Sequence, residues 1–395
     1  MSLKSPATGF LTDQMIIVLA LFAASALYFY ANINGLGLTN DSLRYLNQSI
    51  AFAENHSLSE IGFRNVFPFQ SLEIVLLSFL GDHSLTVMKY LHVFLLGGTI
   101  FIHLIIAFEI LSTAKMRIAY AVTLTFSTPL LMVHSFLWTE PLFILLTSFQ
   151  WYLLWRFFQH KNLKILLLIL LISILYCWQR KAGMLFSLGL VLALVRYFSF
   201  SGRQILIIFA SLLMLILVLY GTIGTVNLIG ERPVLSSIPL NFKNYFGALS
   251  GWILPLPLNL WLRIGVLIVA IICISYWLWK TIPTMPEPLK AYLSSILIIV
   301  LTYFVIRHFY HRPHSDEADR FLAPLYPGVF FLIIFVMEQI ILKTDHHIRK
   351  LVFSVMLILW LAYPVARTFK NAELWHNRTK NPLLIKGQIQ AIHKK

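Results

Sequence analysis

The sequence has few charged residues and almost no cysteine. Asp, Glu, Lys and Arg make up 12% of its 395 residues, whereas a typical soluble domain carries about 25%. Cys177 and Cys273 both stand in apolar runs, so they predict core packing and not a disulfide or metal framework. No His/Cys cluster has zinc spacing, and no glycine-rich phosphate loop or dinucleotide fingerprint occurs. These absences argue against a nucleotide-binding or zinc-dependent domain.

Acidic residues are also scarce, and apolar ones dominate. The chain has 31 Lys and Arg against 16 Asp and Glu, and its net charge is +15. No compact basic domain accompanies this charge, so membrane phosphates are a better match for it than nucleic acid. Hydrophobic residues make up 58% of the chain, and the mean hydropathy is +0.78. The composition predicts an all-α polytopic membrane protein in contact with the lipid bilayer.

Windows of apolar residues predict about eleven transmembrane helices. The first lacks a small-residue cleavage site, so it is expected to stay as an anchor. The expected spans are 14–32, 87–111, 116–133, 140–158, 163–178, 183–198, 204–226, 260–279, 290–307, 321–342 and 349–366. We expect one membrane domain over residues 1–366, with a first outer loop at 33–86 and a basic tail at 367–395.

The charges of the short loops predict a cytoplasmic N-terminus, because cytoplasmic loops carry an excess of Lys and Arg. With this orientation every inside loop is basic: Lys115, Arg117, Arg156, Lys161, Lys164, Arg196, Arg203, Lys280, Lys290, Lys343, Arg349 and Lys350. The first outer loop, the 227–259 loop, the 308–320 loop and the tail then lie outside.

Two surface helices are expected in the first outer loop. Residues 40–55 have apolar positions at helical spacing, namely Leu43, Leu46, Ile50 and Ala53. The other side of this helix carries Asp41, Tyr45 and Gln48, which we expect to face a water-filled cleft. Asp41 stands where a helix N-cap is wanted, although Thr39 or Asn40 could also cap and leave Asp41 free. The run 66–80 is short for a span and predicts a second surface or re-entrant helix.

Basic residues are unusually common on the expected outer side. They are Arg64, Arg180, Lys181, Arg232, Lys243, Arg307, Arg312 and Arg320. Short translocated loops usually avoid Lys and Arg, so an anionic ligand at the outer membrane face would account for them. Pairing with lipid head groups or with Asp316, Glu317 and Asp319 is the alternative.

Two further features have both a structural and a functional interpretation. Glu140 precedes Pro141 at the start of an expected span, where the helix dipole favours an acid and proline is tolerated. It could equally contribute to a site. His308, His311 and His314 lie close in sequence, but their spacing matches no metal site, so no metal ligand is assigned.

Five segments occur in an order that resembles the GT-C superfamily of polyprenyl-phosphate-sugar glycosyltransferases, the group of the bacterial aminoarabinose transferase and the protein O-mannosyltransferases. They are Asp41-Ser-Leu-Arg-Tyr-Leu, Phe67-Pro-Phe, Thr139-Glu-Pro-Leu-Phe, Gln179-Arg-Lys-Ala-Gly and Asp319-Arg-Phe-Leu-Ala-Pro-Leu-Tyr-Pro. The family layout covers nearly all of the chain. The resemblance implies a GT-C-like fold, a lipid-linked sugar donor and a glycan or lipid-linked acceptor.

The resemblance also implies roles for particular residues. Asp41 corresponds to the family acid and would act as general base, while Arg180, Lys181 and Arg320 would bind the donor phosphate. The expected supporting residues are Tyr45, Arg64, Glu140, Arg232 and Arg312. Many relatives have two acids together in the first loop, but here Asn40 and Ser42 flank the acid. No cofactor is therefore assigned, and a divalent metal is left open. The expected location is the bacterial inner membrane, with the site on its periplasmic side.

Two other functions use the same features. A transporter or flippase for a lipid-linked saccharide would need the apolar groove and the basic residues but no base; its usual paired halves are not found here. A surface-polysaccharide polymerase or ligase would place its main residues in a large late outer loop. The 227–259 loop with Arg232 is the candidate for that.

Overall fold

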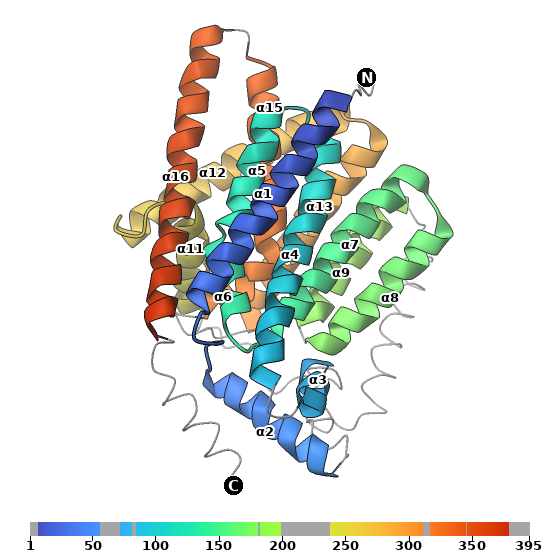
Figure 1. The fold of residues 1–395 in the computed structure, drawn as a ribbon. Helices are drawn as coiled ribbons and strands as arrows, with labels where there is room; N and C mark the ends of the chain where they lie inside the picture. The colour runs from blue at the N-terminus through green and yellow to red at the C-terminus, as the bar shows by residue number, and fades with distance from the viewer. Residues whose placement is uncertain are drawn as a thin grey trace.

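The computed structural model describes residues 7–55, 72–80, 84–180, 182–198, 238–310, 317–344 and 346–378. Almost all of these residues are helical, and no strand occurs among them. The helices form one bundle (Figure 1). Its long helices are α1 (Ala7–Ala31), α4 (Ser84–Ile110), α7 (Glu140–His160), α8 (Leu163–Gln179), α9 (Ala182–Phe198), α12 (Leu260–Thr281), α13 (Glu287–Tyr310), α15 (Tyr326–Leu342) and α16 (His347–Arg378). The expected all-α architecture is therefore confirmed.

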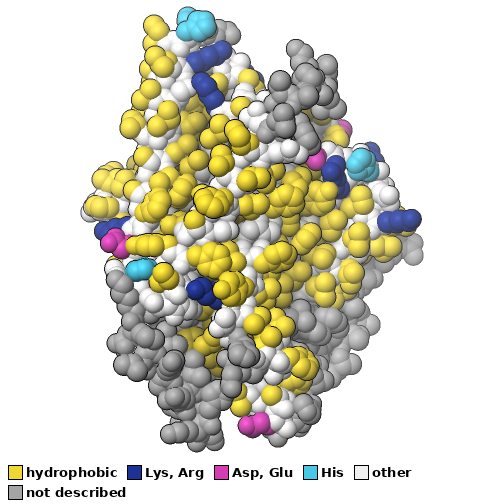
Figure 2. All heavy atoms as spheres, in the orientation of Figure 1, with side chains coloured by type: hydrophobic (Ala, Val, Ile, Leu, Met, Phe, Trp, Pro, Cys, Tyr) yellow, Lys and Arg dark blue, Asp and Glu magenta, His cyan; other side chains and the backbone are white. Residues whose placement is uncertain are grey.

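Seven stretches of the described chain are long and apolar enough to cross a membrane. They are Thr12–Ala31, Leu85–Ile110, Ala114–Ser135, Leu260–Thr284, Glu287–Arg307, Ala318–Leu342 and His347–Asn377. Large apolar side chains on their outer faces are exposed, among them Phe22 and Ile358, and Figure 2 shows one face covered mainly by hydrophobic side chains. A surface of this kind is suited to lipid. The chain is thus a multi-pass membrane protein, and the expected span 204–226 lies outside the described residues.

The short helices α2 (Asn40–Asn55) and α3 (Leu72–Leu80) lie at one end of the bundle, the lower end in Figure 1. The predicted helix at 40–55 coincides with α2. The predicted run 66–80 contains α3, and its residues before 72 lie outside the described part. Two more short helices, α11 (Ile238–Ile253) and α14 (Ala318–Leu322), complete the elements used below.

The expected single span 116–133 is two helices, α5 (Ala114–Thr125) and α6 (Thr128–Ser135). The Ser127 hydroxyl caps α6 by accepting from the Leu130 amide at 3.2 Å. The carbonyl of Phe126, left without a helical donor at the break, accepts from the Thr368 hydroxyl at 2.6 Å. A break inside a membrane domain is tolerated where another element satisfies the freed backbone groups in this way.

The last helix extends past the expected domain boundary at residue 366. α16 continues to Arg378, and Thr368 and Ala372 on this extension are fully buried. The His376 ring stacks on Tyr30 of α1 with centroids 4.6 Å apart. Residues 367–378 therefore belong to the bundle and not to a separate tail, because they have burial partners of their own. Residues 379–395 lie outside the described part.

Candidate functional site

A close approach of two loops brings the start of α2 to the start of α7. The Gly37 amide donates to the Ser135 carbonyl at 2.9 Å, and the Leu137 amide donates to the Gly37 carbonyl at 3.0 Å. A Cβ at Gly37 would lie 2.5 Å from the Phe136 ring, so glycine permits this contact. The bridge places residues 39–42 beside residues 138–140.

The N-cap of α2 is Thr39, and Asp41 is left free for other contacts. The Thr39 hydroxyl accepts from the Ser42 amide at 3.4 Å, and the Ser42 hydroxyl accepts from the Thr39 amide at 3.0 Å. This reciprocal pattern is a capping box built with serine. Trp138 joins it, because its indole Nε1 donates to Thr39 Oγ1 at 2.8 Å. The alternative that Asp41 itself serves as the cap is therefore wrong.

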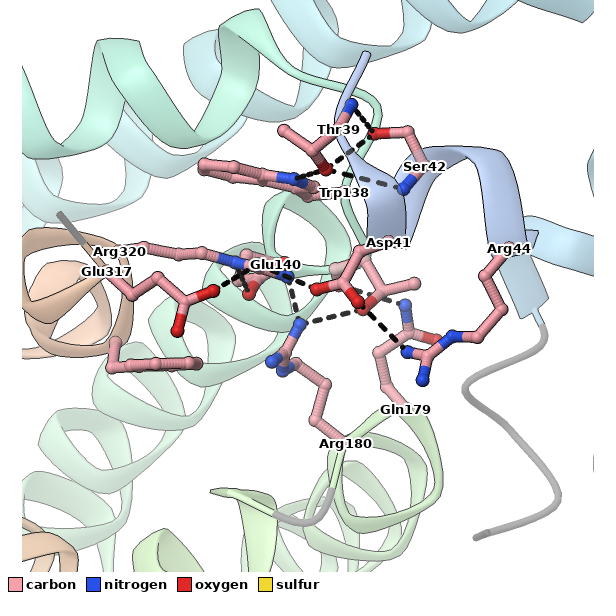
Figure 3. Close-up of polar contacts among 12 residues, drawn as sticks. Thr39, Asp41, Ser42, Arg44, Trp138, Glu140, Gln179, Arg180, Glu317 and Arg320 are labelled. Carbon is pink, nitrogen blue, oxygen red and sulfur yellow. Dashed lines mark hydrogen bonds and ion pairs between the residues drawn. The ribbon is translucent and has the colours of Figure 1, made fainter. Parts of the chain in front are cut away.

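Arg320 of α14 joins the two acids of the site, as Figure 3 shows. Its Nη1 donates to Asp41 Oδ2 at 2.8 Å, and its Nε donates to Glu140 Oε1. The guanidinium carbon lies 4.1 Å from the centroid of the Trp138 ring, a cation–π contact. The Arg320 side chain is only 4% exposed. Arginine is suited to this place because its planar fork can bind two carboxylates and stack on an indole at once.

Arg180, at the end of α8, supplies the second cation. Its Nη1 forms an ion pair with Glu140 Oε2 at 2.6 Å and donates to Thr139 Oγ1 at 2.7 Å. The neighbouring Gln179 is fully buried, and its Nε2 donates to the Thr139 carbonyl at 3.1 Å. Glu140 is thus held between two arginines, and this explains how a carboxylate can be 97% buried here.

The two acids differ in accessibility. The Asp41 side chain is 34% exposed and the Glu140 side chain 3%. Asp41 also faces Arg44 at 3.4 Å, and Arg44 is itself half exposed. Glu140 is therefore placed to hold the two arginines, and Asp41 is the acid that a ligand can reach. Chemically, the arrangement offers one accessible carboxylate beside the buried cation of Arg320 and the partly buried cation of Arg180.

The structure brings together four residues that the sequence indicated: Asp41, Glu140, Arg180 and Arg320 (Figure 3). Lys181, Arg64, Arg232 and Arg312 lie outside the described residues. The described residues therefore do not test these four.

The expected orientation of α2 is wrong in one respect. Its buried positions are Ser42, Tyr45, Leu46 and Ser49, whereas Ala53 is exposed. Tyr45 was expected to face a cleft, but it is 3% exposed and packs inside the protein. The physical reason is that both sides of α2 have partners: Tyr45 on the polar side lies toward Arg320 of the charged site, and Leu46 of the apolar stripe packs in the core.

Two residues of the site were missed as site residues: the Trp138 ring stacks on the Arg320 guanidinium, and Thr139 accepts from Arg180. Glu317, which the sequence offered as a partner for the outer basic residues, lies 3.9 Å from Arg320. Trp138 and Thr139 directly precede Glu140 in the sequence, so the segment around that acid was the available signal. Nothing in the local sequence pointed to the stacking itself.

A metal ion has no obvious ligand set in this part of the chain. Among the described residues, no group of three or more His, Cys, Asp and Glu side chains could hold one. The acids that approach each other, Asp41 and Glu140, are both engaged by arginine.

Comparison with protein-family models gave no match, and comparison with curated proteins gave no similar sequence.

Proposed function

We propose that the protein is a membrane glycosyltransferase with a GT-C-like fold of about eleven spans. It transfers a sugar from a polyprenyl-phosphate donor to an acceptor hydroxyl at the outer face of a bacterial inner membrane. The observation that carries the proposal is the position of Asp41, an accessible carboxylate held at the bundle end directly opposite the buried Arg320. An acid that must act on a substrate has to be reachable, and a departing phosphate needs cations beside it.

In the proposed reaction Asp41 takes the proton of the acceptor hydroxyl. The acceptor oxygen forms a bond to the anomeric carbon of the sugar, and the bond from that carbon to the phosphate oxygen breaks. The electron pair of the broken bond stays on the leaving polyprenyl phosphate. Arg320 and Arg180 stabilise this charge together with Lys181, and electrostatic stabilisation of this kind is often the largest catalytic contribution.

The ion pairs of the site determine what a donor phosphate must displace when it binds. Without a donor, Arg320 and Arg180 are already neutralised by Asp41 and Glu140. A donor phosphate that binds Arg320 must therefore compete with Asp41 for its Nη1 group. Donor binding would thus release Asp41 from its ion pair and make it available as a base. Glu140 would keep both arginines in place during the exchange.

The test is turnover by the purified full-length protein in detergent, with polyprenyl-phosphate sugar as donor and no energy source. Asp41→Asn should fold normally, because the amide oxygen still accepts from Arg320, but it should lose most of the turnover. Glu54→Gln is the matched control, since Glu54 is an exposed acid at the far end of the same helix. Near-normal turnover by Asp41→Asn would remove Asp41 from the mechanism. Product formation without energy coupling also separates a transferase from a transporter.

A further inference from the structure

A second charged cluster lies next to the first in sequence and differs from it in charge balance. Asp319, the residue before Arg320, accepts from the Trp252 indole Nε1 at 2.6 Å. It also pairs with Arg367 Nη2 of α16 at 3.2 Å. α14 thus carries one residue for each cluster, Arg320 toward Asp41 and Asp319 toward α11 and α16.

The guanidinium groups of Arg263 and Arg367 approach each other beside Gly251 of α11. Its carbonyl accepts from the Tyr363 hydroxyl at 2.6 Å and from Arg367 Nη1. A Cβ at Gly251 would lie 3.3 Å from Arg263 Nη1 and 3.7 Å from Arg367 Nη1. Both arginines therefore approach the same small residue from different helices, α12 and α16.

Arg263 has no counter-charge among the residues that the structure describes. It is 7% exposed, and its Nε and Nη1 atoms are buried without a hydrogen-bond partner among the described residues. The Nε atom of Arg367 is likewise buried without a hydrogen-bond partner among these residues. Asp319 neutralises one of the two cations, and the other remains unpaired. Burying an unpaired charge is costly, whereas in the Asp41 cluster Arg320 and Arg180 are matched by two carboxylates.

The positions of Arg263 and Arg367 in their helices place both side chains at the depth expected for lipid phosphates. Arg263 lies in the first turn of α12, and Arg367 directly follows the apolar stretch of α16. Both positions are expected at a membrane–water boundary. Trp261, Leu262 and Val266 beside Arg263 are exposed. An amphiphile could therefore lay its chains on this apolar surface while its head group reaches Arg263.

We propose that Arg263 and Arg367 form a second anion-binding site, which takes a phosphate group. The donors without a partner are Nε and Nη1 of Arg263 and Nε of Arg367, and guanidinium N–H groups bind phosphate oxygens strongly. The phosphate is that of an anionic membrane lipid or of a free phosphate ion. The site is independent of the transferase proposal, because its binding residues are not those of the Asp41 cluster.

The test uses the purified full-length protein in neutral detergent, with binding followed by native mass spectrometry and by thermal shift. The probes are phosphatidic acid, diacylglycerol as its uncharged counterpart, and inorganic phosphate. Wild-type protein should bind phosphatidic acid and not diacylglycerol, and Arg263→Gln should weaken this binding by about tenfold or more. Lys280→Gln is the matched control, because it removes one exposed cation at the opposite end of α12. This control should bind as the wild type does.

The outcomes separate the two sources of phosphate. Saturable, Arg263-dependent binding of inorganic phosphate as well as lipid supports a site for the phosphate group alone. Arg263-dependent binding of phosphatidic acid only supports a lipid head-group site. Equal binding of phosphatidic acid by Arg263→Gln, Lys280→Gln and wild-type protein overturns the proposal. Arg263→Gln should keep or raise the lipid-free unfolding temperature, since it removes a costly unpaired charge; a lowered temperature with unchanged lipid binding would assign Arg263 a purely structural role.

Discussion

The guanidinium of Arg320 donates to Asp41 on one side and to Glu140 on the other. These partners are 279 and 180 positions away in the chain. One side chain therefore ties three distant segments together, the surface helix α2, the start of α7 and the short helix α14. The accessible acid is held in place by this contact, so stability and function are expected to depend on the same residue.

Loss of the Asp41 carboxylate should abolish most of the transfer activity. General-base catalysis contributes about 10²–10⁴-fold, so we expect Asp41→Asn to lower turnover by about that factor with little change in the unfolding temperature. The measurement is the initial rate of sugar transfer by purified protein. Arg44→Gln is informative beside it, because Arg44 pairs with Asp41 from the exposed side and should affect turnover much less.

Loss of Arg320 should destabilise the bundle, because Glu140 would keep only Arg180 as a counter-charge. Removing one partner of a buried pair costs about 3–5 kcal/mol, so Arg320→Gln should lower the unfolding temperature clearly. The double variant Arg320→Gln with Glu140→Gln should recover part of this loss, since the buried charge is then removed as well. Strictly additive losses in the double-mutant cycle would contradict the coupling.

Gly37→Ala should disturb the site through Phe136. The new Cβ would lie 2.5 Å from that ring, and Phe136 stacks on Trp138 with centroids 4.7 Å apart. Displacing Phe136 therefore moves the Trp138 ring that stacks on Arg320 and should lower activity. Gly265→Ala is the control, because a Cβ there has open space around it and alanine favours a helix. Equal activity in the two variants would mean that the loop adjusts freely.

Thr368→Val should destabilise the protein at the break between α5 and α6. The variant removes the hydroxyl that donates to the Phe126 carbonyl and contacts the Thr128 hydroxyl at 2.9 Å. A buried carbonyl left without a donor costs about 1–3 kcal/mol. Thr368→Ser keeps the hydroxyl and should retain most of the stability. Thermal unfolding in detergent measures the difference, and equal loss in both variants would point to packing instead.

The extent of the helices was largely predictable, because helix formation depends on local properties. Apolar runs of sufficient length predicted helices in every expected range that falls among the described residues, and the capping residues with the apolar spacing of 40–55 predicted α2. The break at Phe126-Ser127 was missed, because the average hydropathy of the window outweighed the local helix-start signal of Ser127, Thr128 and Pro129. The broken backbone at Phe126 is stabilised by the Thr368 hydroxyl, which is 242 residues away in the sequence.

The candidate site was predictable in part. Asp41, Arg180 and Arg320 were selected from their place along the chain, and the structure brings them together. The linking role of Glu140 was not predictable, since a helix-dipole role explained it equally well. The burial of Tyr45 was also missed, because the spacing of apolar residues does not show which charged groups the polar face of α2 will contact.

By itself the sequence determined that the chain is helical and embedded in a membrane, and which acids and bases are available near its loops. Hydrophobicity and helical period are properties of neighbouring residues, so they can be read along the chain. Only the tertiary structure decided which charges are neutralised and which remain unpaired. Arg320 meets Asp41 and Glu140, whereas Arg263 meets no acid in the described part of the chain. That difference depends on how helices pack, and a guanidinium group finds its partner through space and not through sequence.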